Sequence, residues 1–191
     1  MEPPPPIICA AYAEIPDVIN QTQPKRITPE KINRDVPWAY FDGAAQRQGC
    51  GGGILLHLSD THYFQICLGL GPGTNNHAEL ITLRHLIYFA MTKNCQQIQI
   101  FGDSKTVVDW FNNKSNCHAY SLKHILEEIV FFKTFFDQII VSHIYRERNS
   151  IADRLSKEAA DRPLGDWMIE EFSPTGTYRY YHRPYIDGPL Q

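Results

Sequence analysis

An aromatic and apolar run that stops at an acidic residue constrains the fold of this chain more than any other feature. The run extends from Pro37 to Ala44 and contains Trp-Ala-Tyr-Phe followed by Asp42-Gly43. Four to eight apolar residues closed by glycine are typical of a buried strand. Asp42 then stands where the strand leaves the sheet. Taken alone, an Asp-Gly pair also fits an ordinary turn.

The segments that follow predict an α/β fold. Apolar runs at 54–58 and 62–70 continue an antiparallel meander, and residues 75–92 carry apolar side chains at spacings of three and four, the pattern of a core-facing helix. Further strands are expected at 97–101 and 139–144, and further helices at 105–111, 122–129 and 151–159. We therefore expect a five-stranded mixed sheet, three antiparallel strands followed by two parallel ones, flanked by helices.

The 191 residues suffice for one core of about 100 to 150 residues with extensions. Prolines in residues 1–35 predict an extended arm or linker, with a basic patch nearby. Residues 36–162 form the predicted globular domain. Residues 163–191 are expected to be a tail in which aromatic and cationic side chains alternate. Aromatic and cationic side chains in this pattern are able to stack on bases and contact phosphates. Alternatively, the tail packs on the domain or lacks order.

Composition excludes several classes of protein. The net charge of -3 gives no overall basicity, so any nucleic-acid site must concentrate its cations locally. Five scattered cysteines without a Cys-x2-Cys pair argue against a disulfide framework and a structural zinc site, and favour a reducing intracellular compartment, nucleus or cytoplasm. No apolar run approaches the ~20 residues of a membrane span, so no membrane partner is expected.

Four acidic residues are expected to converge at one edge of the sheet. Asp42 and Asp103 follow strands, whereas Glu79 and Asp153 lie in the first turns of helices that leave strands. The carboxyl edge of parallel strands is where ligands bind in open α/β sheets, and helix amino termini there favour phosphate. Hard oxygen ligands suit Mg²⁺, with Mn²⁺ as substitute. Two such ions would support an in-line phosphodiester displacement.

Each acid also has a purely structural interpretation. Glu79 and Asp153 each stand three residues after a possible helix cap, as in capping pairs. Asp103 fits a cap for the helix that begins beside it, and Asp42 fits a turn. For any one acid, the structural interpretation explains the residue as well as a metal-binding role does. Together, these interpretations leave the convergence of the four acids unexplained.

Four ordered blocks carry a resemblance to a known family. They are Tyr-Phe-Asp42-Gly-Ala, Thr74-Asn-Asn-His-Ala-Glu79-Leu, Phe-Gly-Asp103-Ser and Arg146-Glu-Arg-Asn-Ser-Ile-Ala-Asp153. Together they resemble the type 1 ribonuclease H family over about residues 37–161. More narrowly, the chain is similar to the ribonuclease H domains of plant LINE-type retroelement reverse transcriptases, and Arg146 resembles the arginine of the archaeal-like branch.

The resemblance implies endonucleolytic cleavage of the RNA strand of RNA/DNA hybrids, leaving 5′-phosphate and 3′-hydroxyl ends. It implies two Mg²⁺ ions, bridged by Asp42 and completed by Glu79, Asp103 and Asp153, with Arg146 as a further catalytic residue. It also implies a monomeric domain beside a reverse transcriptase in one polyprotein. The residues expected to contact nucleic acid are Gly43, Arg47, Gln48, Thr74, Asn75, Asn76 and Lys105, among which the two asparagines would read 2′-hydroxyls and Thr74 would hold a DNA phosphate.

Some positions depart from the family pattern. Gln48 stands where several members place an asparagine, and residues 112–120 leave no room for a basic protruding helix. His143 is interpreted as a structural residue of a buried strand rather than as the mobile histidine of many relatives. Arg146 could instead be a surface cation paired with Glu147, and the asparagines at 75 and 76 could serve a turn and a helix cap.

Two other functions remain open. One is a catalytically silent module that binds hybrid without turnover. The other is a DEDD-type 3′-to-5′ exonuclease, which needs a histidine or tyrosine general base shortly before its last acid. His143 and Tyr145 are the candidates for that base.

Overall fold

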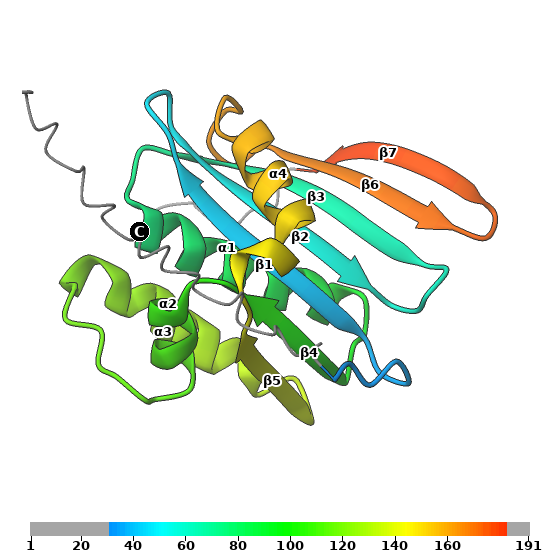
Figure 1. The fold of residues 1–191 in the computed structure, drawn as a ribbon, viewed down its shortest axis with the longest axis horizontal. Coiled ribbons are helices and arrows are strands. Elements are labelled where there is room, and N and C mark those ends of the chain that lie inside the picture. The colour runs from blue at the N-terminus through cyan, green and yellow to red at the C-terminus, as the bar shows by residue number, and fades with distance from the viewer. Residues whose placement is uncertain (1–30, 183–191) are drawn as a thin grey trace, which may run out of the picture.

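A computed structural model describes residues 31–182. The prediction of an arm over residues 1–35 lies mostly outside this range, as does the end of the predicted tail, residues 183–191. Up to residue 159, the strands and helices follow one another in the order that the apolar runs predicted (Figure 1).

The elements are named in chain order. They are β1 (Trp38–Ala45), β2 (Cys50–His57), β3 (Tyr63–Gly71), α1 (Asn75–Thr92), β4 (Gln97–Gly102), α2 (Lys105–Phe111), α3 (Tyr120–Lys133), β5 (Gln138–His143), the 3₁₀ turn η1 (Arg146–Arg148), α4 (Ser150–Ala159), β6 (Trp167–Ser173) and β7 (Gly176–His182).

The strands form one mixed sheet in the order β5-β4-β1-β2-β3-β6-β7. As predicted, β1, β2 and β3 pair antiparallel, and β4 and β5 run parallel to β1. The sheet has seven strands where five were expected. The two additional strands lie within the predicted tail. β6 pairs antiparallel with β3, and β7 forms an antiparallel hairpin with β6.

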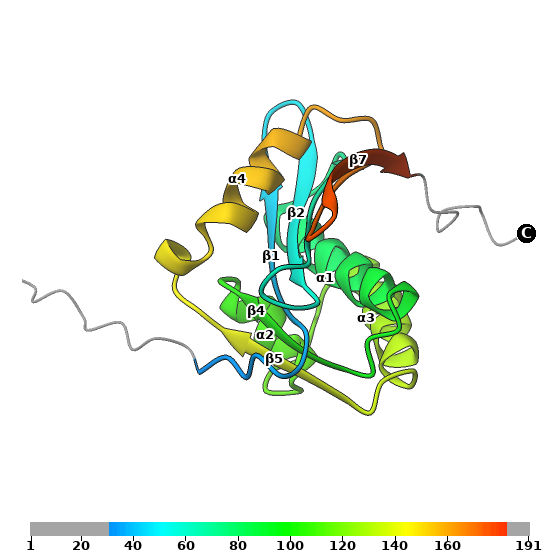
Figure 2. The same cartoon turned by 90° about the vertical axis from the view of Figure 1, so that its right-hand side faces the viewer.

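Helices cover the sheet on both faces (Figure 2). α1, α2 and α3 lie on one face, and α4 lies alone on the other. The main core lies under the first group and includes the fully buried side chains of Phe41, Phe64 and Trp167. A smaller cluster of Cys67, Leu155 and Ala159 lies under α4. Burial of apolar area on both faces explains why the central strands are apolar almost throughout.

A glycine run in β2 allows α4 to lie close to the sheet. A Cβ added at Gly53 would stand 2.1 Å from the backbone oxygen of Ala152, and one at Gly51 would stand 2.1 Å from that of Ser156. Any side chain at these positions would push the helix away from β2. The position of α4, and therefore of the residues on its first turns, depends on this close approach.

Candidate active site

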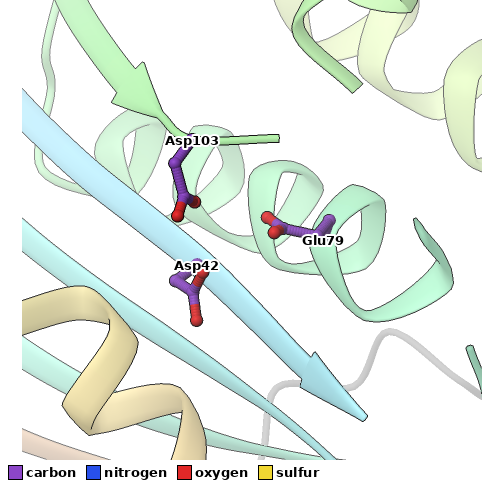
Figure 3. Close-up of side chains that lie close together, drawn as sticks. All are labelled: Asp42, Glu79 and Asp103. Atoms are coloured by element: carbon purple, nitrogen blue, oxygen red, sulfur yellow. The ribbon is translucent and has the colours of Figure 1, made fainter. Parts of the chain in front are cut away.

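Three carboxylates meet at the carboxyl edge of the sheet (Figure 3). Asp42 belongs to β1, Glu79 to the first turns of α1, and Asp103 directly follows β4. One oxygen from each side chain lies within 4.8 Å of the others. Three of the four acids predicted from the sequence therefore converge, as the strand directions require.

The close contact between β1 and α1 brings the first two carboxylates together. A Cβ added at Gly43 would lie 2.2 Å from the backbone nitrogen of Glu79, so only glycine lets the strand end against the helix. The helix caps are neighbouring hydroxyl residues. Thr74 caps α1 by accepting a hydrogen bond from the backbone N–H of His77, and Ser104 caps α2. The capping interpretation of Glu79 and Asp103 is therefore wrong.

Two residues that sequence reasoning did not single out hold these carboxylates in place. The side-chain amide of Asn149 donates to Asp103 Oδ1 (3.1 Å) and to the backbone oxygen of Phe41 (2.8 Å). The buried hydroxyl of Ser156 donates to Asp42 Oδ2, and its oxygen also lies 2.8 Å from the backbone oxygen of Asp153. Asn149 stands inside a recognised sequence block, but no local signal marks Ser156, which comes close to Asp42 only through the packing of α4.

The fourth acid, Asp153, shares the cavity but not the cluster. The cavity has a volume of about 380 Å³ and is lined by all four acids, together with Arg146 and Lys157. Arg146 lies 2.8 Å from Asp153 Oδ1, and Lys157 Nζ lies 2.5 Å from Asp153 Oδ2. Arg146 is therefore directed at the site, and the suggestion that it pairs with Glu147 is wrong.

Burial and neighbouring negative charges disfavour the ionised forms of Asp42 and Glu79. Burial, with the nearby charges of Asp42 and Asp103, raises the pKa of Glu79 to about 9. Burial also raises the pKa of Asp42 to about 6, although the Ser156 hydroxyl opposes this shift. Asp153 differs: burial raises its pKa, but hydrogen bonds from Lys157 and Arg146 outweigh this and hold the pKa below its ordinary value.

The donor set fits a hard divalent cation. Asp42 and Glu79 are only 6% and 7% exposed, and Glu79 Oε2 has no hydrogen-bond partner among residues 31–182. A buried carboxylate oxygen without a partner is costly. Carboxylate oxygens are the ligands that Mg²⁺ and Mn²⁺ prefer, so an ion bound by Asp42, Glu79 and Asp103 would offset this cost.

A sequence profile of the Reverse transcriptase-like family matches residues 40–159, which include all four acids. The chain belongs to that family. A comparison with curated protein sequences gives no significant match.

Solved structures show that this family member has the ribonuclease H fold. Ribonuclease H1 from the halophilic archaeon Halobacterium salinarum is 27% identical with a TM-score of 0.61, and the match covers 64% of this chain and 96% of that one. LC11 ribonuclease H1, solved in complex with an RNA/DNA hybrid, is 23% identical with a TM-score of 0.60, over 66% and 97% of the two chains. These matches support the assignment as a ribonuclease H that the sequence blocks predicted.

A longer viral chain contains a domain of similar fold. The protease-reverse transcriptase of prototype foamy virus is 18% identical with a TM-score of 0.54. The match covers 73% of this chain but only 22% of the viral one, so the similarity concerns the fold of one part of that protein.

The residues predicted to contact nucleic acid fall into two groups in this ribonuclease H fold. Gly43, Asn75 and Asn76 line the cavity with the acids. The side-chain oxygen of Asn75 accepts a hydrogen bond from the backbone N–H of Ala45 (2.8 Å), which joins the end of β1 to the start of α1. Thr74 lines an adjacent cavity of about 500 Å³, whose walls also include Asn76, His77, Trp110 and His118.

The second group lies outside both cavities. Arg47 and Gln48 are exposed in the turn after β1, where the Gln48 amide donates to Gln46 Oε1. Lys105 is exposed on α2 and pairs with Asp109. The structure therefore does not bring these three residues to the acids.

His143 differs from the expectation of a buried structural residue. β5 is an edge strand in which only Val141 is buried, so His143 is exposed at its end. The His143 Nε2 atom lies 3.2 Å from the backbone oxygen of Asp103. An imidazole side chain therefore stands beside the acidic edge of this ribonuclease H, together with the exposed Tyr145.

Among residues 31–182, no helix is long and apolar enough to span a bilayer.

Proposed function

We propose that this protein is an endonuclease that hydrolyses the RNA strand of RNA/DNA hybrids with the help of two divalent ions, Mg²⁺ or Mn²⁺. The observation that carries the proposal is the cluster of Asp42, Glu79 and Asp103, in which a buried carboxylate oxygen has no partner within the described chain. The cluster opens into a cavity lined by polar side chains, as a nuclease site requires.

Asp42, Glu79 and Asp103 would hold one divalent ion, and Asp42 with Asp153 would hold a second. Bound there, such ions activate water as a nucleophile and neutralise charge on the phosphodiester. Ser156 and Asn149 fix the orientation of two of the carboxylates before any ligand arrives, which reduces the reorganisation that binding requires.

The amide side chains beside the acids provide a means to distinguish RNA from DNA. Asn75 and Asn76 line the cavity next to Glu79, and amides can donate to and accept from 2′-hydroxyl groups in the minor groove of a hybrid. Thr74 faces the adjacent cavity, where Trp110 offers an apolar wall. We assign this second cavity to the DNA strand. The solved complex of LC11 ribonuclease H1 with an RNA/DNA hybrid supports this substrate class.

We further propose that the domain is the degradation module of a retroelement polyprotein, of the plant LINE type, next to a reverse transcriptase domain. The four sequence blocks motivate this assignment, and the foamy virus match provides an example of the fold within a longer reverse transcriptase chain. The archaeal-like role of Arg146 as a catalytic residue is supported by its contact with Asp153.

A cleavage assay tests the proposal. RNA labelled at its 5′ end is annealed to DNA and incubated with the protein and Mg²⁺, and binding is followed separately by fluorescence polarisation in Ca²⁺. Internal cuts that require Mg²⁺ and disappear in Asp103→Asn support the proposal. Trimming from the 3′ end supports an exonuclease, and tight binding without cutting supports a silent module. Either of the last two outcomes overturns the endonuclease assignment.

A further inference from the structure

The fourth acid of the site is already occupied by cations of the protein itself. Lys157 Nζ and Arg146 contact the two carboxylate oxygens of Asp153 at 2.5 and 2.8 Å. Asp42 Oδ2 is likewise engaged by the Ser156 hydroxyl. The oxygens that would receive a second divalent ion therefore have protein partners, whereas Glu79 Oε2 has none within the described residues.

A lysine four residues after an aspartate on a helix is ordinarily a surface ion pair of little consequence. α4 itself contains such a pair, Arg154 with Glu158 at 2.9 Å, both about half exposed. The pair of Lys157 with Asp153 differs from this pair in its location. Lys157 and Asp153 both line the cavity with the other three acids, and the Asp153 side chain is only 18% exposed.

We propose that Lys157 is a displaceable internal cation that holds Asp153 in place until a second divalent ion enters, and so sets the affinity of the site for that ion. This inference rests on the proposed function. The side chain of Lys157 is 46% exposed, so its flexible stem can carry the ammonium group out to solvent. Lys157 is a positioning residue in this role, because it acts through Asp153.

The two ion positions then differ in affinity. An ion that binds Asp42, Glu79 and Asp103 displaces no cation, and it relieves repulsion among buried carboxylates. An ion that binds Asp42 and Asp153 must break the contact with Lys157 and is repelled by its ammonium group. Neutralising Lys157 removes both penalties, which we expect to lower the dissociation constant of the second ion by about tenfold.

Mn²⁺ titration of the full chain without nucleic acid measures both affinities. Electron paramagnetic resonance counts free Mn²⁺, and calorimetry gives the stoichiometry. Lys157→Gln should tighten the second ion about tenfold and leave the first unchanged, and Lys157→Arg should behave like the wild-type protein. Arg154→Gln removes the same charge from the same helix away from the cavity, and it should change neither affinity. Thermal melting checks that each variant is folded, and Lys157→Ala provides a second neutral variant.

In cleavage assays, the same variants should differ in the Mg²⁺ concentration that cleavage requires. Lys157→Gln should reach half-maximal cleavage at a lower Mg²⁺ concentration than the wild type. The proposal is overturned if Lys157→Gln and Lys157→Ala bind the second ion as the wild type does, or if Arg154→Gln tightens it equally. Those results leave the nuclease assignment intact. Failure of the wild-type protein to cut hybrid, despite binding Mn²⁺, instead contradicts the proposed function.

Discussion

Binding of a divalent ion to the three-carboxylate cluster should release protons, so its affinity should depend steeply on pH. In the metal-free protein, the pKa of Glu79 is about 9 and that of Asp42 about 6. Only the deprotonated carboxylates bind the ion. Between pH 6 and 9, one proton leaves Glu79 when the ion binds to this cluster, and the affinity for that ion should rise about tenfold per pH unit. Below pH 6, Asp42 contributes a second proton and the dependence becomes steeper.

The same shifts make the metal-free protein less stable as the pH rises. Both pKa values are raised above their ordinary values of 3.8 and 4.5. Each group therefore contributes stability that is fully present below pH of about 4 and lost as the pH passes the folded-state pKa, about 6 for Asp42 and about 9 for Glu79. A bound ion removes this loss. The increase in melting temperature caused by Mg²⁺ should consequently grow between pH 6 and 9.

Isothermal calorimetry provides the direct measurement. Titrations with Mn²⁺ at pH 7.5 in two buffers of different ionisation enthalpy give the number of protons released, which we expect to be about one for the first ion. Glu79→Gln should abolish the release. Glu158→Gln, which removes an exposed carboxylate of α4 outside the cavity, should retain it. An affinity that is flat from pH 6 to 9, with no proton released by the wild-type protein, would refute the reasoning.

Three further predictions follow from the site. Asp103→Asn should reduce Mg²⁺-dependent cleavage of hybrid by at least about a hundredfold, while the melting temperature of the metal-free protein stays equal or rises, because one like charge is removed. Ser156→Ala should lower the free energy of unfolding in urea by about 1.5–3 kcal/mol at pH 8, and by less at pH 5, where Asp42 is protonated. Gly53→Ala should cost about 1–3 kcal/mol in the same assay and also weaken cleavage, because its Cβ would meet the Ala152 oxygen and displace α4.

The sequence predicts the helices and the central strands well because local signals agree with the tertiary packing. The predicted bounds of α1 and α2 match the structure, since each has an apolar stripe and begins after a capping hydroxyl, Thr74 or Ser104. The hairpin β6-β7 was missed. Trp167 and Ile169 alternate inward as in a strand, but the flanking acids and the exposed tyrosines made this segment resemble a polar tail.

The convergence of the acids was predictable from strand direction alone, but their partners were not. The contact of Asp42 with Ser156 depends on how closely α4 approaches the glycine run of β2. The contacts of Asp153 with Lys157 and Arg146 depend on the side-chain conformations of two long cations. Residue spacing predicts neither set of contacts, since both form only when the helices pack against the sheet.

The environment of Glu79 argues against a module that only binds nucleic acid. A ligand that contacts the rim of the cavity through Asn75 or Thr74 would leave the buried carboxyl group of Glu79 with a pKa raised to about 9, by burial and by the charges of Asp42 and Asp103, and without a partner for Oε2 within the described chain. A protein that binds without cleaving would be more stable with glutamine there. A divalent ion is the ligand that offsets both the burial and the repulsion, so the arrangement is consistent with metal-dependent hydrolysis rather than with binding alone.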